Sequence, residues 1–188
     1  MHNRLVRGLA VAAGLAITAL AGISAPAVAA PAAGSVPNTV AAAALPGAFY
    51  AEAIIRNSGK CVNVAGGSSD NGAWIQQYRC DRTPAAKFLF LSNADGYYEI
   101  SNQSSRKCID IEHGGYWNGA RTQQFNCNGS FTQQYRLVDL GNGYYNFVSR
   151  FSGRCVNVPW GNTDDRVVMN IWDCIPGKAE QQFRLNIG

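Results

Sequence analysis

Short apolar runs, each bounded by turn-forming residues, follow one another along the chain after residue 47. The run Cys61-Val62-Asn63-Val64 precedes Ala65-Gly66-Gly67-Ser68, and Trp74-Ile75-Gln76-Gln77-Tyr78 ends just before the next cysteine. This alternation, punctuated by Gly, Asn, Asp and Ser, is typical of strands of about four to six residues. No run is long enough for an amphipathic helix, so the pattern predicts an all-β domain.

The same pattern occurs three times. Cysteines lie at 61, 108 and 155 and again at 80, 127 and 174, so each set advances by 47 residues and each copy contains a gap of 19. The copies begin SGKCVNV, SRKCIDI and SGRCVNV, and Tyr50, Tyr97 and Tyr144 each lie 11 residues before the first cysteine of their copy. Three such units span residues 48–188, which is an internal repeat.

A period near this length also occurs in helical arrays and in β-propellers. The helical arrays do not fit the strand pattern, and a propeller needs roughly four or more blades. The remaining architecture is a closed three-fold barrel with about four strands per unit. Closure removes the free sheet edges that three separate hairpins would expose.

The first 46 residues differ in composition from the repeats. Arg4 and Arg7 precede an apolar stretch from Leu9 to Ile23, and Ala27-Val28-Ala29 is a small-x-small cleavage sequence. We expect residues 1–29 to be a secretory signal peptide cleaved after Ala29 rather than a membrane anchor, because the stretch is Gly- and Ala-rich and short for a span. The Ala/Pro-rich residues 30–46 are expected to form a disordered leader to a single domain, residues 47–188.

Secretion and six cysteines at matched spacing predict disulfides, for which 15 pairings are possible in principle. The repeat symmetry selects one bridge in each unit. The predicted pairs are Cys61 with Cys80, Cys108 with Cys127, and Cys155 with Cys174. A metal site is disfavoured because the cysteines never occur in close pairs.

The charge balance narrows the possible partners. Removing the signal peptide leaves 14 basic and 12 acidic residues, a net charge of +2, and no basic cluster suggests a nucleic-acid or membrane surface. His2 and His113 are the only histidines, and His2 lies in the signal peptide, so no multi-histidine metal site is possible. We therefore expect no cofactor, no metal, no nucleic acid and no membrane insertion; the oligomeric state stays open.

The repeats resemble a known family. Each has a Cys-Val/Ile-Asn/Asp-Val/Ile strand and an aromatic residue two places before its second cysteine, and the last two copies end in Gln133-Gln134-Tyr135 and Gln181-Gln182-Phe183. These features resemble the ricin B-type lectin repeat, in its secreted bacterial form, across essentially residues 48–188. The resemblance implies a β-trefoil and a secreted, non-catalytic, carbohydrate-binding protein that holds sugars by aromatic stacking and by Asp, Asn and Gln hydrogen bonds.

The resemblance also implies one ligand-binding pocket in each unit. The second unit supplies Asp110, Gln123, Phe125 and Gln133; the third supplies Asn157, Asn170, Trp172 and Gln181; the first supplies Asn63, Gln76 and Tyr78. Two departures from the family pattern affect these sites. The third unit has Asn157 where the second has Asp110, and the first has Ala85 and Ala86 in place of the Asn-Gln pair. The first unit is therefore expected to bind weakest or not at all.

Several of these residues have a structural alternative. The rings of Phe88, Tyr135 and Phe183 are expected in the core. Gln133 and Gln181 either contact ligand or satisfy buried backbone groups, and the Asx residues either bind sugar or hold turns. The aromatic residues Tyr116, Trp117 and Trp160 either extend a pocket or pack over the barrel.

Two other functions fit the sequence less well than carbohydrate binding. A protein-binding trefoil such as a protease inhibitor would present a long loop in one unit only, yet a single-residue insertion near 175–178 is the only break in phase. A glycoside hydrolase needs two opposed carboxylates, whereas Asp164 and Asp165 are sequence neighbours.

Overall fold

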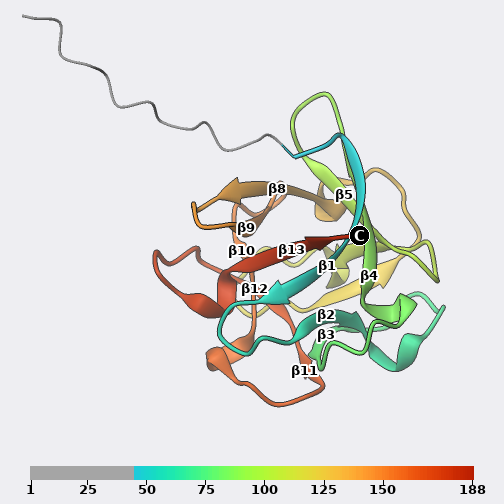
Figure 1. Ribbon diagram of the computed structural model, residues 1–188. Helices are drawn as coiled ribbons and strands as arrows, with labels where there is room; N and C mark the ends of the chain where they lie inside the picture. Colours follow the sequence, from blue (N-terminus) through green and yellow to red (C-terminus); the bar gives the residue numbers. More distant parts are fainter. Residues whose placement is uncertain (1–44) are drawn as a thin grey trace, which may run out of the picture. The chain divides into compact units, whose positions relative to one another are not determined.

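The computed structural model describes residues 45–188, which form 13 strands and six 3-10 turns (Figure 1). The predicted signal peptide and all of the predicted leader except residues 45 and 46 lie outside the described residues. Within residues 45–188, no helix combines the length and the apolar character needed to cross a bilayer.

The strands group into three lobes that follow the repeats. Lobe 1 contains β1 (Ala48–Ile55), β2 (Cys61–Val64), β3 (Ile75–Tyr78) and β4 (Lys87–Ser92). Lobe 2 contains β5 (Tyr98–Asn102), β6 (Cys108–Ile111), β7 (Thr122–Phe125) and β8 (Gln134–Asp139). Lobe 3 contains β9 (Tyr144–Ser149), β10 (Cys155–Asn157), β11 (Val167–Val168), β12 (Asn170–Trp172) and β13 (Phe183–Ile187).

Six of these strands form a closed barrel. The antiparallel pairings run β1–β4–β5–β8–β9–β13 and return to β1, where Ala51 faces Ile187 and Ile55 faces Phe183. Every strand of the ring therefore has two neighbours, and no barrel edge is left unpaired. The all-β class and the closed three-fold barrel are confirmed.

Six of the other seven strands form three hairpins that cap one end of the barrel, β2–β3, β6–β7 and β10–β12, and β11 pairs with β3. The hairpins also pair with one another, through Val168 and Gln76, Trp74 and Gln123, and Arg121 and Asn170. Strands β11 and β12 are separated by the buried Met169, whose backbone bonds to Ile75 of lobe 1 and Thr122 of lobe 2. These contacts make the cap one unit.

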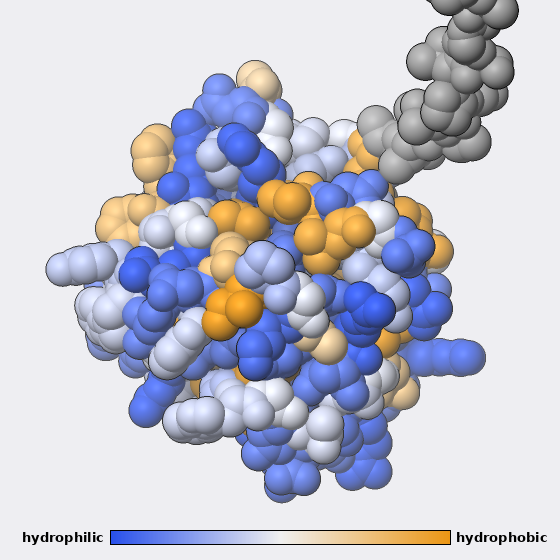
Figure 2. Space-filling view, turned by 90° about the vertical axis from the view of Figure 1, so that its left-hand side faces the viewer, coloured by the Kyte–Doolittle hydropathy of each residue, from blue (hydrophilic) through white to orange (hydrophobic). Residues whose placement is uncertain are grey.

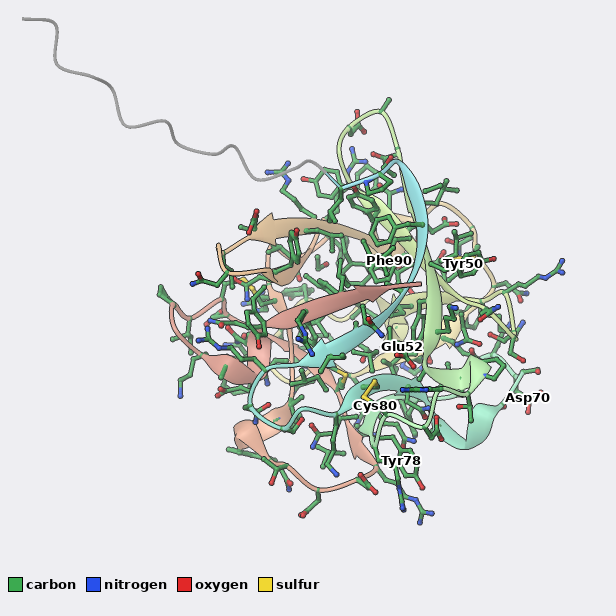
Figure 3. The ribbon with its side chains drawn as sticks, viewed as in Figure 1. Tyr50, Glu52, Asp70, Tyr78, Cys80 and Phe90 are labelled. Carbon is green, nitrogen blue, oxygen red and sulfur yellow. A yellow bond between two sulfur atoms is a disulfide. The ribbon has the colours of Figure 1, made fainter. Side chains whose placement is uncertain are left out.

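Aromatic rings fill the barrel. Phe88, Tyr135 and Phe183 are fully buried, which confirms that they belong to the core. Phe49 stacks on Phe90 with ring centroids 5.0 Å apart, and Figure 3 shows Phe90 inside the barrel. The surface is different: on the face drawn in Figure 2, most side chains are hydrophilic, and they surround a small apolar group.

The three predicted disulfides are present, one in each lobe. They join Cys61 to Cys80, Cys108 to Cys127 and Cys155 to Cys174, with Cα atoms 5.0, 5.1 and 5.0 Å apart. Each bridge ties the first strand of a hairpin to the chain just after its second strand. All six cysteines are used.

Contacts with the barrel begin slightly before the predicted domain start at residue 47. Leu45 packs against the core, and the Tyr98 hydroxyl donates to the Pro46 carbonyl at 3.4 Å. These two residues of the predicted leader therefore lie against the domain.

Replacing one cysteine pair at a time by alanine should lower the free energy of unfolding by about 3 kcal/mol, because each bridge closes a loop of about 20 residues in the unfolded chain. The losses should be similar in the three lobes, since all three bridges have a sequence separation of 19. Urea unfolding of the three double variants measures this. A large loss in one lobe and none in the others would contradict it.

Candidate functional site

Each hairpin carries one polar pair across its strands. Asn63 lies opposite Gln76, Asp110 opposite Gln123, and Asn157 opposite Asn170. Hydrogen bonds join the side chains, at 3.1 Å from Gln76 to Asn63 and at 2.9 Å from Asn157 to Asn170. The predicted polar residues of each unit are thus brought together as a preformed pair.

An aromatic ring accompanies each polar pair. Tyr78, Phe125 and Trp172 lie two residues beyond Gln76, Gln123 and Asn170, so ring and polar side chain share one face of the strand. Phe125 and Trp172 are 37% and 39% exposed, and Tyr78 is half-buried. Figure 3 shows Tyr78 projecting from the hairpin of lobe 1, close to the bridged Cys80.

In lobe 3 these groups line a hollow of 520 Å³, which we call the lobe 3 hollow. Asn157, Asn170 and Trp172 form part of its wall, together with Glu180 and Trp160. Trp160 is 97% exposed, so it does not pack over the barrel. An aromatic ring exposed to this degree at the rim of a hollow is available to a ligand.

The backbone holds Trp160 in an unusual conformation. Its φ is 53°, and the equivalent positions 47 and 94 residues earlier, His113 and Gly66, have φ of 51° and 63°. This left-handed turn suits glycine, whereas a large side chain there is strained. Strain of this kind is concentrated at functional sites, which favours a ligand role for the ring of Trp160.

Lobe 2 retains the only carboxylate in a polar pair. The Gln123 amide lies 3.5 Å from one oxygen of Asp110, which is a long contact, and the other oxygen, Oδ1, is buried with no hydrogen-bond partner among the described residues. Buried polar atoms are nearly always satisfied. A ligand hydroxyl donating to Oδ1 would satisfy it.

Lobe 1 also has a hollow, although its sequence predicts the weakest binding site. Asn63, Gln76 and Tyr78 line a hollow of 410 Å³, the lobe 1 hollow, with Ala85 where lobes 2 and 3 have Thr132 and Glu180. Asp81 also lines it. Hydrogen bonds from the hydroxyl and the backbone N–H of Thr83 hold the pKa of Asp81 below its ordinary value, so this carboxylate is ionised at neutral pH.

Gln133 and Gln181 have a structural function. Gln133 accepts from the backbone N–H of Asn128 and donates to the carbonyl of Asn126, at 2.9 and 3.0 Å. Gln181 makes the same two bonds to Ile175 and Asp173, both at 2.9 Å. Both side chains are buried, so each amide holds a loop of the backbone in place, and Gln181 also forms part of the wall of the lobe 3 hollow.

The hollows are completed by the neighbouring lobe, which the sequence did not reveal. Gly119 and Arg121 of lobe 2 line the lobe 3 hollow, and Arg166 of lobe 3 lines the lobe 1 hollow. The buried Gln124 holds one such loop by donating to the carbonyls of Ser68 and Asp70 at 2.8 and 2.9 Å. The one feature of the sequence that points to these contacts between lobes is the repeat itself, because it places the contacting loops at equal spacing.

Two other aromatic residues that the sequence singled out lie elsewhere. Tyr116 and Trp117 are exposed and pack edge-to-face with ring centroids 5.8 Å apart, and neither lines the lobe 1 or the lobe 3 hollow. His113 is exposed and lies 3.8 Å from Glu112.

Comparison with known proteins identifies the family. Models of the family described as ricin-type β-trefoil lectin domain-like match residues 50–125, 90–172 and 131–187. These matches cover most of the chain, so the chain belongs to this family. No curated protein matches.

Three solved structures illustrate the similarity. The designed three-fold symmetric protein ThreeFoil is 34% identical with a TM-score of 0.71, over 72% of this chain and 96% of ThreeFoil. An exo-β-1,3-galactanase from Clostridium thermocellum is 27% identical with a TM-score of 0.72, over 74% of this chain but only 30% of the galactanase. A ricin B-like lectin from Macrolepiota procera, solved with lactose, is 15% identical with a TM-score of 0.64, over 76% of this chain and 97% of the lectin; at this identity only the fold is shared.

Gln133→Ala should lower the free energy of unfolding by roughly 1–3 kcal/mol, because a buried backbone donor and acceptor lose their partners. Urea unfolding measures the loss. Gln103→Ala is the matched control, since Gln103 is exposed and its side chain makes no hydrogen bond within residues 45–188; it should change stability by less than about 0.5 kcal/mol. Equal unfolding midpoints for the two variants would contradict the structural role.

Proposed function

We propose that this protein is a secreted, non-catalytic carbohydrate-binding protein whose sugar sites lie on the hairpin cap. The observation that carries the proposal is the constellation repeated in every lobe, a polar cross-strand pair beside a partly exposed ring. Family membership and the lactose-bound fungal lectin with the same fold support it. The three disulfides, which persist in oxidising compartments, support secretion.

The chemistry of a pyranose fits this arrangement. One face of the ring presents C–H groups, which pack on an aromatic side chain, and the rim presents hydroxyls, which need both donors and acceptors. Asn157 and Asn170 offer amide donors and acceptors beside Trp172, and Asp110 offers acceptors beside Phe125. The pairs are already joined and shielded from water, so little ordering is needed on binding.

The strength of a single site follows from these contacts. Stacking contributes about 0.5–1.5 kcal/mol beyond area burial, and a hydrogen bond to a carboxylate about 1.5–3 kcal/mol. A single site of this kind has a Kd in the roughly micromolar to millimolar range. Several sites on one rigid cap gain about 10²- to 10⁴-fold on a clustered glycan.

The lobes differ in how they present a carboxylate. Lobe 2 has Asp110 within the polar pair, lobe 3 has Glu180 on the wall of its hollow, and lobe 1 has Asp81 on the wall of its hollow. Because the carboxylate approaches a bound ring from a different position in each lobe, we propose that the three sites prefer different sugars.

Trp172→Ala combined with Asp110→Ala should weaken retention on immobilised neutral glycans about 10²-fold or more, because one substitution removes the stacking ring of lobe 3, the other removes the carboxylate of lobe 2, and the gain from several sites is lost. Each single variant should weaken binding about tenfold or less. A glycan array followed by titration with the best ligand measures both effects.

Leu91→Ala is the control for that experiment, since Leu91 is 47% exposed on the barrel strand β4, outside the three hairpins. It should bind as the unaltered protein does. Unchanged retention of the double variant would refute the site assignment, and failure of the unaltered protein to bind any saccharide would refute the function.

A further inference from the structure

One turn position differs among the three lobes. Gly72, Gly119 and Arg166 are separated by 47 residues each, and their φ angles are 85°, 93° and 66°. Left-handed backbone of this kind suits glycine, and a side chain there is strained. Lobe 3 therefore holds an arginine where the fold favours glycine. Arg106 of lobe 2 shows the same exchange at a turn away from the lobe 1 and lobe 3 hollows, so it is the position of Arg166 beside a hollow, together with the strain, that indicates a functional role.

The strained arginine lies beside a binding hollow. The backbone N–H of Arg166 donates to the Gln77 carbonyl at 2.9 Å, which fixes the turn against β3 of lobe 1. Arg166 thereby lines the lobe 1 hollow together with Asn63, Gln76 and Tyr78. The guanidinium thus comes from lobe 3, and the polar pair and the ring come from lobe 1.

The carboxylates near this arginine do not form ion pairs with it. Within residues 45–188, Arg166 forms no ion pair. Its neighbour Asp165 is engaged by Lys60 at 2.5 Å and by Arg79 at 3.3 Å. Asp81 shares the hollow, but its Oδ1 accepts from Thr83 at 2.7 and 3.1 Å.

A second arginine shows the same exchange near this hollow. Arg82 has a φ of 59°, where the corresponding turns of lobes 2 and 3 use Gly129 and Gly177 with φ of 72° and 80°. Arg82 is exposed and lies between Asp81 and Thr83, both of which line the lobe 1 hollow. Two exposed guanidinium groups, those of Arg166 and Arg82, therefore lie at or beside the lobe 1 hollow, in turns where the other lobes have glycine.

The cations at the lobe 3 hollow, in contrast, have partners. Lys178 lies 3.6 Å from Glu180, and Arg121 stacks over the ring of Trp74 at 5.2 Å. Arg166 differs from these two cations because it has neither an ion pair nor an aromatic ring as a partner within residues 45–188.

We propose that the lobe 1 hollow binds an acidic saccharide, with Arg166 pairing the negatively charged group of the sugar. The proposal rests on the carbohydrate-binding function given above and names the ligand class of one site. The sugar ring packs on Tyr78, its hydroxyls meet Asn63 and Gln76, and the planar guanidinium donates two parallel hydrogen bonds to a carboxylate or a sulfate ester. A carboxylate and a sulfate ester both accept these paired hydrogen bonds, so the experiment uses a saccharide of each kind.

Calorimetric titration of the purified protein with matched oligosaccharides tests the proposal. The ligands are a neutral hexose oligomer, the corresponding uronic acid oligomer and a 6-O-sulfated form. The unaltered protein should bind at least one acidic form about tenfold or more tightly than the neutral one, as a charge-assisted hydrogen bond provides. That preference should decrease as salt is raised.

The variant Arg166→Gly restores the residue that the other two lobes use, so it should fold normally. It should lose the preference for the acidic form and leave neutral binding unchanged. Arg106→Gly is the matched control, because Arg106 has a φ of 58° in a turn of lobe 2 and lines neither hollow. It should keep the preference.

Two results would overturn this proposal alone. Equal affinity of the unaltered protein for acidic and neutral forms would exclude an anion site, and an acidic preference that survives Arg166→Gly would place the anion site away from Arg166. Both results leave the carbohydrate-binding function intact. Absence of binding to every saccharide would overturn both proposals together.

Discussion

Closure of the barrel by β1 and β13 is the constraint on which the rest of the structure depends. These strands come from opposite ends of the repeat region, and their register, from Ala51 opposite Ile187 to Ile55 opposite Phe183, completes the ring of six. A closed ring leaves no unpaired edge and forces alternate side chains inward, where Phe88, Tyr135 and Phe183 fill the space. The three hairpins are then held at one end, where they pair with one another.

Because the three lobes share one backbone fold, each functional position can be compared with the equivalent position in the two other lobes. The rim position is occupied by Gly66, His113 and Trp160, and the neighbouring turn by Gly72, Gly119 and Arg166. Because the backbone conformation is the same in each set, the differences in side chain are not required by the fold. Two of them, Trp160 and Arg166, line the hollows, which is where differences in ligand preference would arise.

Much of the fold follows from the sequence because it is encoded locally and repeated. A period of 47 and a gap of 19 are visible in the chain, and with them the all-β class, the disulfide pairs and the buried final rings. The roles of Gln133 and Gln181 did not follow, because a glutamine that holds a loop and one that binds a sugar look identical in sequence. Only the backbone partners at both ends of each amide distinguish them.

Contacts between lobes could not be predicted for a different reason. Arg166 reaches the hollow of lobe 1 although it lies about 100 residues from Asn63, because the rotation between lobes brings the turn of one against the hairpin of the next. The 47-residue period predicts that each lobe has an equivalent turn, but it does not predict which lobe's turn lies against which lobe's hairpin. The prediction that lobe 1 binds weakest rests on residues of the first repeat alone, so it does not include Arg166, which comes from lobe 3.

The side-chain amides of the cap provide the most direct test of the site. An NMR titration with a saccharide that binds would follow the chemical shifts of the side-chain amides. The polar pairs contribute Asn63, Gln76, Gln123, Asn157 and Asn170, and the loop-holding glutamines are Gln133 and Gln181. The amides of the polar pairs in the occupied lobes should shift on binding, and the two loop-holding glutamines should shift little. Saturation with sugar that leaves every polar pair unchanged would contradict a carbohydrate site on the hairpin cap.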